Sequence, residues 1–208
     1  MSTAEIRTFI VGYIETNMYF IHNNQQGIII DPGFIESEFD SLIKKIRKDV
    51  LEVPMVILTH CHFDHITGCT ILKKEFNCKI YCHKLDEDKL LDPQKSGASL
   101  FGTSSIQPRP DAYLEDGQEI NFFDLNLKVL HTPGHTRGSI SVLFQDIYLF
   151  SGDTIFKDGL GRTDLYDGDY DTEINSIRNR ILTFPDDTII YPGHGPATTV
   201  KEERKNFL

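Results

Sequence analysis

Short apolar runs and amphipathic stretches alternate along this chain of 208 residues. Runs rich in Ile, Val, Phe, Tyr and Thr predict β-strands, because these side chains suit a pleated and half-buried surface. In the first half of the chain, strands are predicted at residues 8–21, 27–30, 53–58 and 79–82. In the second half, they are predicted at residues 119–123, 125–130, 139–144, 147–150 and 188–191.

Helices are predicted between these strands. Residues 34–50 carry apolar side chains at helical spacing, namely Phe39, Leu42, Ile43, Ile46 and Val50. Further helices are predicted at residues 64–76, 83–91 and 171–184 and after Thr198. Residues 92–111 hold several Pro and Gly residues without periodicity, which predicts a long loop. Strands and helices thus occur twice in the same order, a pattern that suits two packed sheets with helices outside.

Length and composition narrow the class of protein. A chain of 208 residues can bury one sizeable core, and we predict a single domain over residues 1–208. The formal net charge of −10 argues against nucleic acid as a partner, since phosphate binding needs clustered Lys and Arg. The sequence shows neither a secretory leader nor an apolar run of membrane-spanning length. The four cysteines are therefore expected to be reduced thiols of a cytoplasmic protein.

The most informative segment is Thr59-His60-Cys61-His62-Phe63-Asp64-His65, which directly follows a predicted buried strand. His60 and His62 point the same way if the backbone is extended, because side chains alternate along a strand. Cys61 then points away from them, into the packing. Asp64 and His65 fall at the start of the next predicted helix. This spacing supplies ligands for two adjacent metal centres.

Three more candidate ligands follow predicted strands in Gly-containing loops. They lie in His131-Thr132-Pro133-Gly134-His135-Thr136, in Phe150-Ser151-Gly152-Asp153-Thr154 and in Tyr191-Pro192-Gly193-His194-Gly195. Loops that leave a rigid strand are the usual platform for a functional site. Imidazole and carboxylate together suit zinc, and they also suit iron or manganese. The sequence therefore predicts a metal site.

Taken together, these motifs resemble those of the metallo-β-lactamase superfamily, and the similarity runs from Ile30-Asp31-Pro32-Gly33 to Pro192-Gly193-His194-Gly195. Within the superfamily, Gly161-Arg162-Thr163-Asp164 and His194-Gly195-Pro196, with the later Glu203-Arg204, are similar to the short glyoxalase II-like (hydroxyacylglutathione hydrolase-like) proteins. The resemblance implies an α/β fold, the αββα four-layer sandwich, with the site at one edge of its two sheets.

The resemblance also implies two divalent metal ions and the residues that bind each of them. The implied ligands are His60, His62 and His135 for the first ion, Asp64, His65 and His194 for the second, and Asp153 as the bridge. A carboxylate has two oxygens and can touch both ions of such a pair. Zinc is the expected metal, with iron or manganese as alternatives.

The activity that the resemblance implies is hydrolysis of a small thioester such as S-lactoylglutathione by a hydroxide shared between the two ions. Asp64 would orient the attacking water or accept its proton. No general acid is expected, because a thiol of pKa about 8.5 leaves readily as an anion. Arg162 would either bind a substrate carboxylate or hold its own loop. The chain ends at Leu208, where typical glyoxalase II enzymes continue into a glutathione-binding helical segment. The sequence therefore does not decide whether glutathione is the thiol that carries the acyl group.

Other functions compete with hydrolysis. Iron-dependent persulfide dioxygenases carry a string similar to residues 59–68 and hold one iron through positions that match His60, His135 and Asp153. The Pro192-Gly193-His194-Gly195-Pro196 loop resembles the hydrolase form and favours hydrolysis. Three further functions are disfavoured. Flavodiiron reductases have Glu at the position of His62, and a nuclease would need a basic arm that this sequence does not show. A non-catalytic binding module would be expected to have lost metal ligands, whereas all seven are present here.

The remaining singled-out residues have simpler interpretations. Asp31 is expected in a turn or as a support for the ligands. His22, His83 and His131 are expected to be ordinary surface or turn histidines. Tyr166 and Tyr170 would line the substrate entrance. The oligomeric state is not fixed by any of these patterns.

Overall fold

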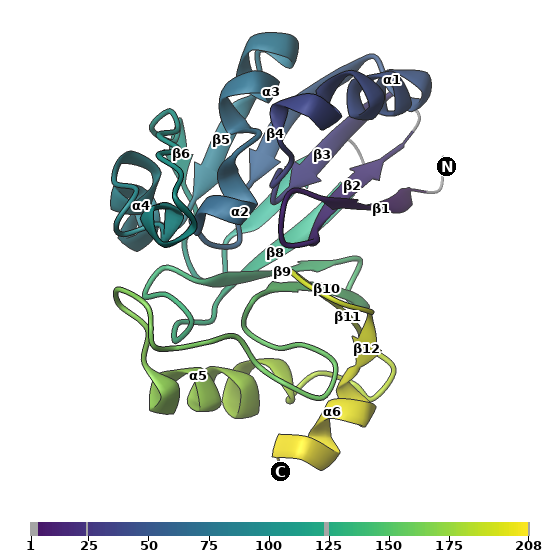
Figure 1. Ribbon diagram of the computed structural model, residues 1–208. Coiled ribbons are helices and arrows are strands. Elements are labelled where there is room, and N and C mark those ends of the chain that lie inside the picture. The colour runs from purple at the N-terminus through teal and green to yellow at the C-terminus, as the bar shows by residue number, and fades with distance from the viewer. Residues whose placement is uncertain (1–3, 24, 123–124, 208) are drawn as a thin grey trace. The chain divides into compact units, whose positions relative to one another are not determined.

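The computed structural model describes residues 4–23, 25–122 and 125–207. The chain divides into two compact units. The N-terminal unit consists of Met1–Cys82 and Glu87–Tyr113, and the C-terminal unit consists of His83–Asp86 and Leu114–Leu208. Figure 1 shows the elements of both units, and each unit is described below by itself.

The described part of the N-terminal unit holds a mixed sheet with the strand order β1-β2-β3-β4-β5-β6. The first three strands pair antiparallel and the others join in parallel. The strands are β1 (Glu5–Val11), β2 (Thr16–His22), β3 (Gln26–Ile30), β4 (Glu52–Ile57), β5 (Lys79–Cys82) and β6 (Ala112–Tyr113). Parallel neighbours need crossover connections, and helices supply them here.

The helices of this unit bury one apolar stripe against the sheet. They are η1 (Glu36–Glu38), α1 (Phe39–Asp49), α2 (Phe63–Ile66), α3 (Cys69–Phe76), α4 (Glu87–Leu91) and η3 (Ala98–Phe101). Leu42 and Ile46 of α1 and Leu72 of α3 share one core cluster with Ile29 of β3 and Val56 of β4. Figure 1 shows α1 and α3 on the same face of the sheet. This packing fixes β4, whose end carries the first histidine motif.

The C-terminal unit holds a second mixed sheet with the order β12-β11-β10-β9-β8-β7 among the described residues. All neighbours pair antiparallel except β10 and β11, which are parallel. The strands are β7 (Glu119–Phe122), β8 (Leu125–His131), β9 (Ile140–Phe144), β10 (Tyr148–Gly152), β11 (Ile189–Pro192) and β12 (Thr198–Thr199). The ends of β8, β10 and β11 carry the other candidate ligands.

Helices also cover this second sheet. The short helix η2 (Lys84–Asp86) precedes α5 (Tyr170–Ser176), which continues as the π-helical turn η4 (Ile177–Ile181), and α6 (Val200–Phe207) closes the described chain. Ile177 and Ile181 of η4 and Val200 of α6 share a core cluster with Leu149 of β10 and Ile190 of β11. None of the helices in the described part of the chain is long and apolar enough to cross a membrane.

Several predicted elements are interrupted in the structure. The strand predicted at residues 8–21 is broken by a turn, because Gly12 and Glu15 adopt positive φ values of 72° and 58°. The helix predicted at residues 64–76 is divided into α2 and α3. There the Gly68 N–H donates to the Pro32 carbonyl at 2.7 Å, and a Cβ at Gly68 would meet the Phe34 ring at 2.2 Å.

Other boundaries differ by a few residues. The helix predicted at residues 34–50 starts only at Phe39, and the one predicted at 171–184 turns π-helical after Ser176. The helix predicted at 83–91 is divided into η2 and α4. The strands β6 and β12 were not predicted, because two residues carry no periodic pattern. The last residue of the strand predicted at 119–123 lies outside the described residues.

His22 was predicted at the surface, and the structure corrects this. Its side chain is fully buried at the end of β2, where it stacks on Phe20 with ring centroids 4.7 Å apart. Neither ring nitrogen has a hydrogen-bond partner among the described residues, and Nε2 lies 3.8 Å from a Glu5 carboxylate oxygen. Burial lowers the pKa of His22, and the charge of Arg7 lowers it further, while Asp49 and Glu5 act against this.

A pH dependence of stability follows for this site. Because the folded-state pKa of His22 lies below its unfolded value, its contribution is present above pH about 6.5 and is lost as the pH falls toward the folded pKa. The variant His22→Phe keeps the ring and removes the titration. We expect its melting temperature to fall less than that of the wild type between pH 7.5 and pH 5.5. Equal losses in the two proteins would contradict the assignment.

Candidate metal centre

The loop after β4 gathers three imidazoles in the N-terminal unit. His60, His62 and His65 are all buried, and Asp64 beside them is nearly so. The His60 ring centroid lies 4.9 Å from that of His62 and 4.1 Å from that of His65. The backbone stays extended through His62, at φ −68° and ψ 151°, before α2 begins. Three buried imidazoles in mutual contact are arranged as ligands of a cation rather than as separately solvated side chains.

The Asp31 carboxylate fixes this loop through contacts with Thr59 and His65. Asp31 sits at φ 52° directly after β3, and its side chain is 1% exposed. Its carboxylate accepts the Thr59 N–H at 2.7 Å and the Thr59 hydroxyl at 2.6 Å, and it lies 3.0 Å from Nδ1 of His65. The predicted supporting role of Asp31 agrees with these contacts.

The same contacts assign the tautomers of two histidines. Thr59 gives its hydroxyl proton to Asp31, so its oxygen accepts the proton on Nδ1 of His60, 3.2 Å away. Asp31 likewise accepts the proton on Nδ1 of His65. Both rings are then left with an unprotonated Nε2, which is the form that a metal requires. Ligand atoms of Asp31, His60 and His65 lie within 4.8 Å of one another, and we treat Asp31 as the orienting member because its oxygens already accept hydrogen bonds.

Asp64 is fixed by two neighbours. Its Oδ2 accepts the Thr16 hydroxyl at 3.1 Å and lies 3.1 Å from Nε2 of His65. A Cβ at Gly33 would lie 1.7 Å from the Asp64 carbonyl oxygen, so only glycine fits at that position of the turn after β3. The sequence motif at residues 30–33 and the histidine motif therefore pack directly against each other.

The C-terminal unit gathers the remaining candidate ligands around Asp153. Nε2 of His135 and Nε2 of His194 each lie 3.6 Å from the same Asp153 oxygen, Oδ2. This spacing is too long for a hydrogen bond. It is close to the separation of about 3.4 Å between two ligands on a tetrahedral zinc with bonds of about 2.1 Å. Asp153, at the end of β10, can thus share a cation with His135 and with His194, which follow β8 and β11.

A carbonyl oxygen orients the His135 ring. Nδ1 of His135 donates to the Arg162 carbonyl at 2.7 Å, which leaves Nε2 unprotonated on the side of Asp153. A Cβ at Gly161 would lie 2.0 Å from the Asp153 carbonyl oxygen and 2.7 Å from Nδ1 of His135. The Gly161-Arg162 loop thus approaches both candidate ligands closely through its backbone.

The Arg162 side chain is engaged within its own loop. Its Nε and Nη2 donate to the two oxygens of Asp164 at 2.7 and 2.9 Å, and both side chains are more than half exposed. Of the two roles predicted for Arg162, this geometry favours holding the loop. Binding of a substrate carboxylate stays a prediction. Tyr166 and Tyr170 are exposed, as an entrance would need, and their role is likewise a prediction.

Two buried carboxyl groups that the motifs did not reveal hold the loop at residues 132–138. Glu173 of α5 accepts the His135 N–H at 2.6 Å. Asp86 of η2 accepts the Thr136 hydroxyl and the Gly138 N–H, each at 2.9 Å. Both are far from the loop in the sequence. The sequence could have indicated these two residues only through an acidic side chain on the face of a helix that is buried.

Glu173 is expected to position His135 through this hydrogen bond. Burial raises the pKa of Glu173 to about 9. Glu173→Ala leaves the buried His135 N–H unpaired, which should cost about 1–3 kcal/mol of stability and weaken metal binding about 10–100-fold. Glu173→Gln keeps an acceptor oxygen and should bind metal as the wild type does. Urea unfolding and metal competition with a chromogenic chelator measure both effects, and wild-type behaviour of Glu173→Ala would refute the role.

The other histidines and the cysteines lie outside this arrangement. His83 and His131 stack on each other with ring centroids 4.3 Å apart and are half-buried. Cys61 is buried in the core cluster of the N-terminal unit, as predicted from its alternation. All four cysteines are free thiols.

The chain belongs to the metallo-β-lactamase superfamily, whose family model matches residues 11–194. A probable metallo-hydrolase, YqgX of Bacillus subtilis, is 35% identical over 93% of this chain and 92% of its own length. The hydroxyacylglutathione hydrolase GloC of Haemophilus influenzae is also 35% identical, over 88% of this chain and 87% of its own length.

Two solved structures agree with this membership. The B3 metallo-β-lactamase BLEG-1 has a TM-score of 0.90 at 34% identity and covers 98% of both chains. TTHA1623, solved in a di-iron-bound form, has a TM-score of 0.84 at 29% identity and covers 96% of this chain and 98% of its own. The predicted metallo-β-lactamase fold, α/β with two mixed sheets and helices, is confirmed, and the chain is a metallo-hydrolase of this superfamily.

Proposed function

We propose that this protein is a binuclear metal-dependent thioesterase that hydrolyses a small thioester such as S-lactoylglutathione. The observation that carries the proposal is the pair of donor clusters, each with imidazole Nε2 atoms turned toward a carboxylate. The similarity to the hydroxyacylglutathione hydrolase GloC supports the choice of substrate. Residues 1–208 act as a single domain in this proposal.

The proposed ligands are the seven residues that the sequence singles out. They are His60, His62 and His135 for one ion, Asp64, His65 and His194 for the other, and Asp153 as the bridge. The assigned tautomers of His60, His65 and His135 fit this role, since each keeps its Nε2 unprotonated. The ions are proposed to be zinc, with iron or manganese as alternatives, and a similar protein has been solved in a di-iron-bound form.

The bound ions would lower the pKa of water to about 7 and withdraw electron density from the thioester carbonyl. Asp64 supplies the proton acceptor. Its Oδ2 accepts the Thr16 hydroxyl at 3.1 Å, which fixes the orientation of the carboxylate that would orient a water and take its proton. The leaving thiolate needs no proton from the protein, because a thiol has a pKa of about 8.5.

Location and partners are part of the same proposal. Four free thiols are in keeping with a reducing compartment, and we place the enzyme in the cytoplasm. Its partner is a small-molecule thioester, with a glutathione conjugate as the first candidate, and neither nucleic acid nor membrane takes part.

The competing function is an iron-dependent persulfide dioxygenase that uses His60, His135 and Asp153 alone. An anaerobic assay separates the two. Under nitrogen, the metal-loaded protein should release glutathione from S-lactoylglutathione, because hydrolysis consumes only water. Oxygen uptake with glutathione persulfide and no hydrolysis under nitrogen would replace the thioesterase by the dioxygenase.

A further inference from the structure

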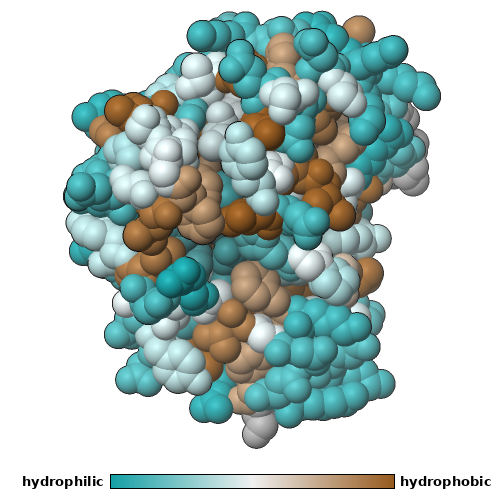
Figure 2. Space-filling model, viewed as in Figure 1, coloured by the Kyte–Doolittle hydropathy of each residue, from teal (hydrophilic) through white to brown (hydrophobic). Residues whose placement is uncertain are grey.

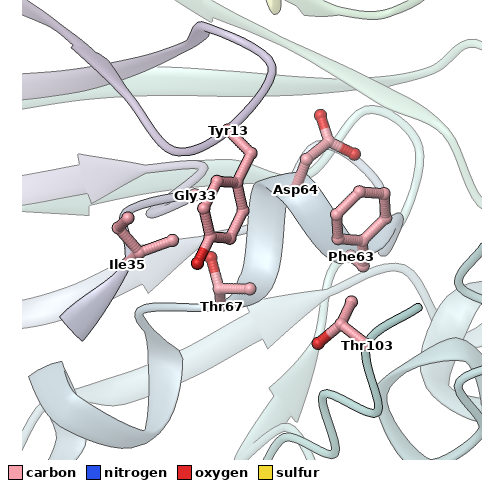
Figure 3. A pocket seen from close by; sticks show the side chains of 7 residues that line it. All are labelled: Tyr13, Gly33, Ile35, Phe63, Asp64, Thr67 and Thr103. Carbon is pink, nitrogen blue, oxygen red and sulfur yellow. The ribbon is translucent and has the colours of Figure 1, made fainter. Parts of the chain in front are cut away.

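A cleft in the N-terminal unit opens beside Asp64. It is lined by Tyr13, Gly33, Ile35, Phe63, Asp64, Thr67 and Thr103. Figure 3 shows the rings of Tyr13 and Phe63 on different sides of the cleft, with Ile35 and Thr67 on the side of Tyr13. The cleft therefore joins a candidate catalytic residue to walls that are mostly apolar.

Large apolar side chains remain exposed around this cleft. Tyr13, at the turn between β1 and β2, is 78% exposed. Phe101 of η3 packs on Phe63 with ring centroids 4.7 Å apart and is still 55% exposed. Leu100, next to Phe101 in the sequence, is 69% exposed. Figure 2 shows that one face of the molecule carries brown, apolar patches among mostly hydrophilic residues. Clustered exposed apolar residues mark a binding surface more often than isolated ones do.

The wall that carries Tyr13 is held in place. Glu38 accepts the N–H of Gly12 at 3.0 Å and the N–H of Ile35 at 2.9 Å. This carboxylate ties the turn next to Tyr13 to the segment that carries Ile35. Gly12 itself needs its φ of 72°, because a Cβ there would lie 2.5 Å from the Gly33 carbonyl oxygen. The cleft is thus formed before any ligand binds.

One polar group in the cleft lacks a partner. The Thr67 hydroxyl is buried and has no hydrogen-bond partner among the described residues. The hydroxyl oxygen is shielded from solvent, so it offers a ligand in the cleft no exposed polar contact. Among the described residues that line the cleft there is no Lys or Arg, and the charged one, Asp64, is acidic. The two carboxylates of a glutathione carrier are therefore poorly matched to it, whereas an uncharged acyl group is well matched.

We propose that this cleft binds the acyl group of the substrate and selects apolar acyl groups such as butanoyl and hexanoyl over lactoyl. Tyr13 and Phe101 are the specificity-determining residues. This inference rests on the proposed thioesterase function.

The test compares S-lactoyl-, S-butanoyl- and S-hexanoylglutathione on the zinc-loaded full chain, because the three share one carrier. Each methylene that the cleft buries should raise kcat/KM by about fourfold. The variants Tyr13→Ala and Phe101→Ala should flatten this rise, with a larger effect on KM than on kcat. Leu51→Ala removes a residue that is 84% exposed elsewhere in the same unit and serves as the control with the wild-type rise.

The outcomes separate the two proposals. Hydrolysis of all three substrates at equal kcat/KM, or a rise that Tyr13→Ala and Phe101→Ala leave unchanged, would overturn the acyl cleft and leave the thioesterase standing. No hydrolysis of any of the three would overturn the thioesterase and the cleft with it.

Discussion

Replacing His62 with alanine should abolish thioester hydrolysis together with metal binding. His62 lies in the buried imidazole cluster, with its ring 4.9 Å from that of His60 and only 4% of the residue exposed. Loss of a ligand removes several kcal/mol of transition-state stabilisation, so we expect a fall in kcat/KM of about a thousandfold or more. The metal content of the purified variant should fall as well.

The control for this substitution is His83→Ala. His83 is half-buried, stacks on His131 and is not a proposed ligand. We expect wild-type activity and metal content from it. Circular dichroism checks that both variants are folded. Full activity of His62→Ala with a normal metal content would end the proposed ligand assignment.

Replacing Asp31 with asparagine should also damage the site strongly, although Asp31 is not a proposed ligand. Asparagine tolerates the positive φ of 52° and still offers one acceptor oxygen for the Thr59 N–H. Its amide group would then face the Thr59 hydroxyl and Nδ1 of His65, where Asp31 accepts hydrogen bonds. The histidine would take up the other tautomer, with its proton on Nε2.

A ring protonated on Nε2 offers no lone pair at the position where the metal ligand is needed. The exchange of Asp for Asn behind a catalytic histidine costs about 10⁴-fold in kcat in a serine protease for the same reason. Here we expect a loss of metal affinity of about 10–100-fold and a corresponding loss of activity at limiting metal. Isothermal titration with zinc measures the affinity directly.

The matched control is Asp146→Asn, since Asp146 is also an aspartate at positive φ, 58°, but is exposed in the turn between β9 and β10. It should bind zinc as the wild type does. If Asp31→Asn also binds zinc normally, the proposed chain of hydrogen bonds from Asp31 through Thr59 to the histidines is wrong.

The candidate site was more predictable than the elements around it. His60 and His62 could be assigned to one side of an extended loop because side-chain alternation is a local property of the backbone. The close contact of Gly33 with Asp64 also follows motifs visible in the sequence. These features involve residues that are adjacent in the chain, or short sequence motifs that contain a glycine.

The features that escaped prediction depend on contacts between distant segments. Glu173 and Asp86 hold the His135 loop from helices that carry no motif. The break between α2 and α3 arises because Gly68 packs against Phe34 and donates to Pro32, neither of which is near it in the sequence. The burial of His22 likewise depends on its position in the assembled sheet and not on its neighbours in the chain.

The metal content of the purified wild-type chain, measured by elemental analysis after loading and gel filtration, tests the central claim most directly. The seven proposed ligands predict about two metal ions per chain. That result, with anaerobic release of glutathione from S-lactoylglutathione, is what the binuclear thioesterase requires. A single iron per chain with no anaerobic hydrolysis, or a chain that retains no metal after loading, would contradict it.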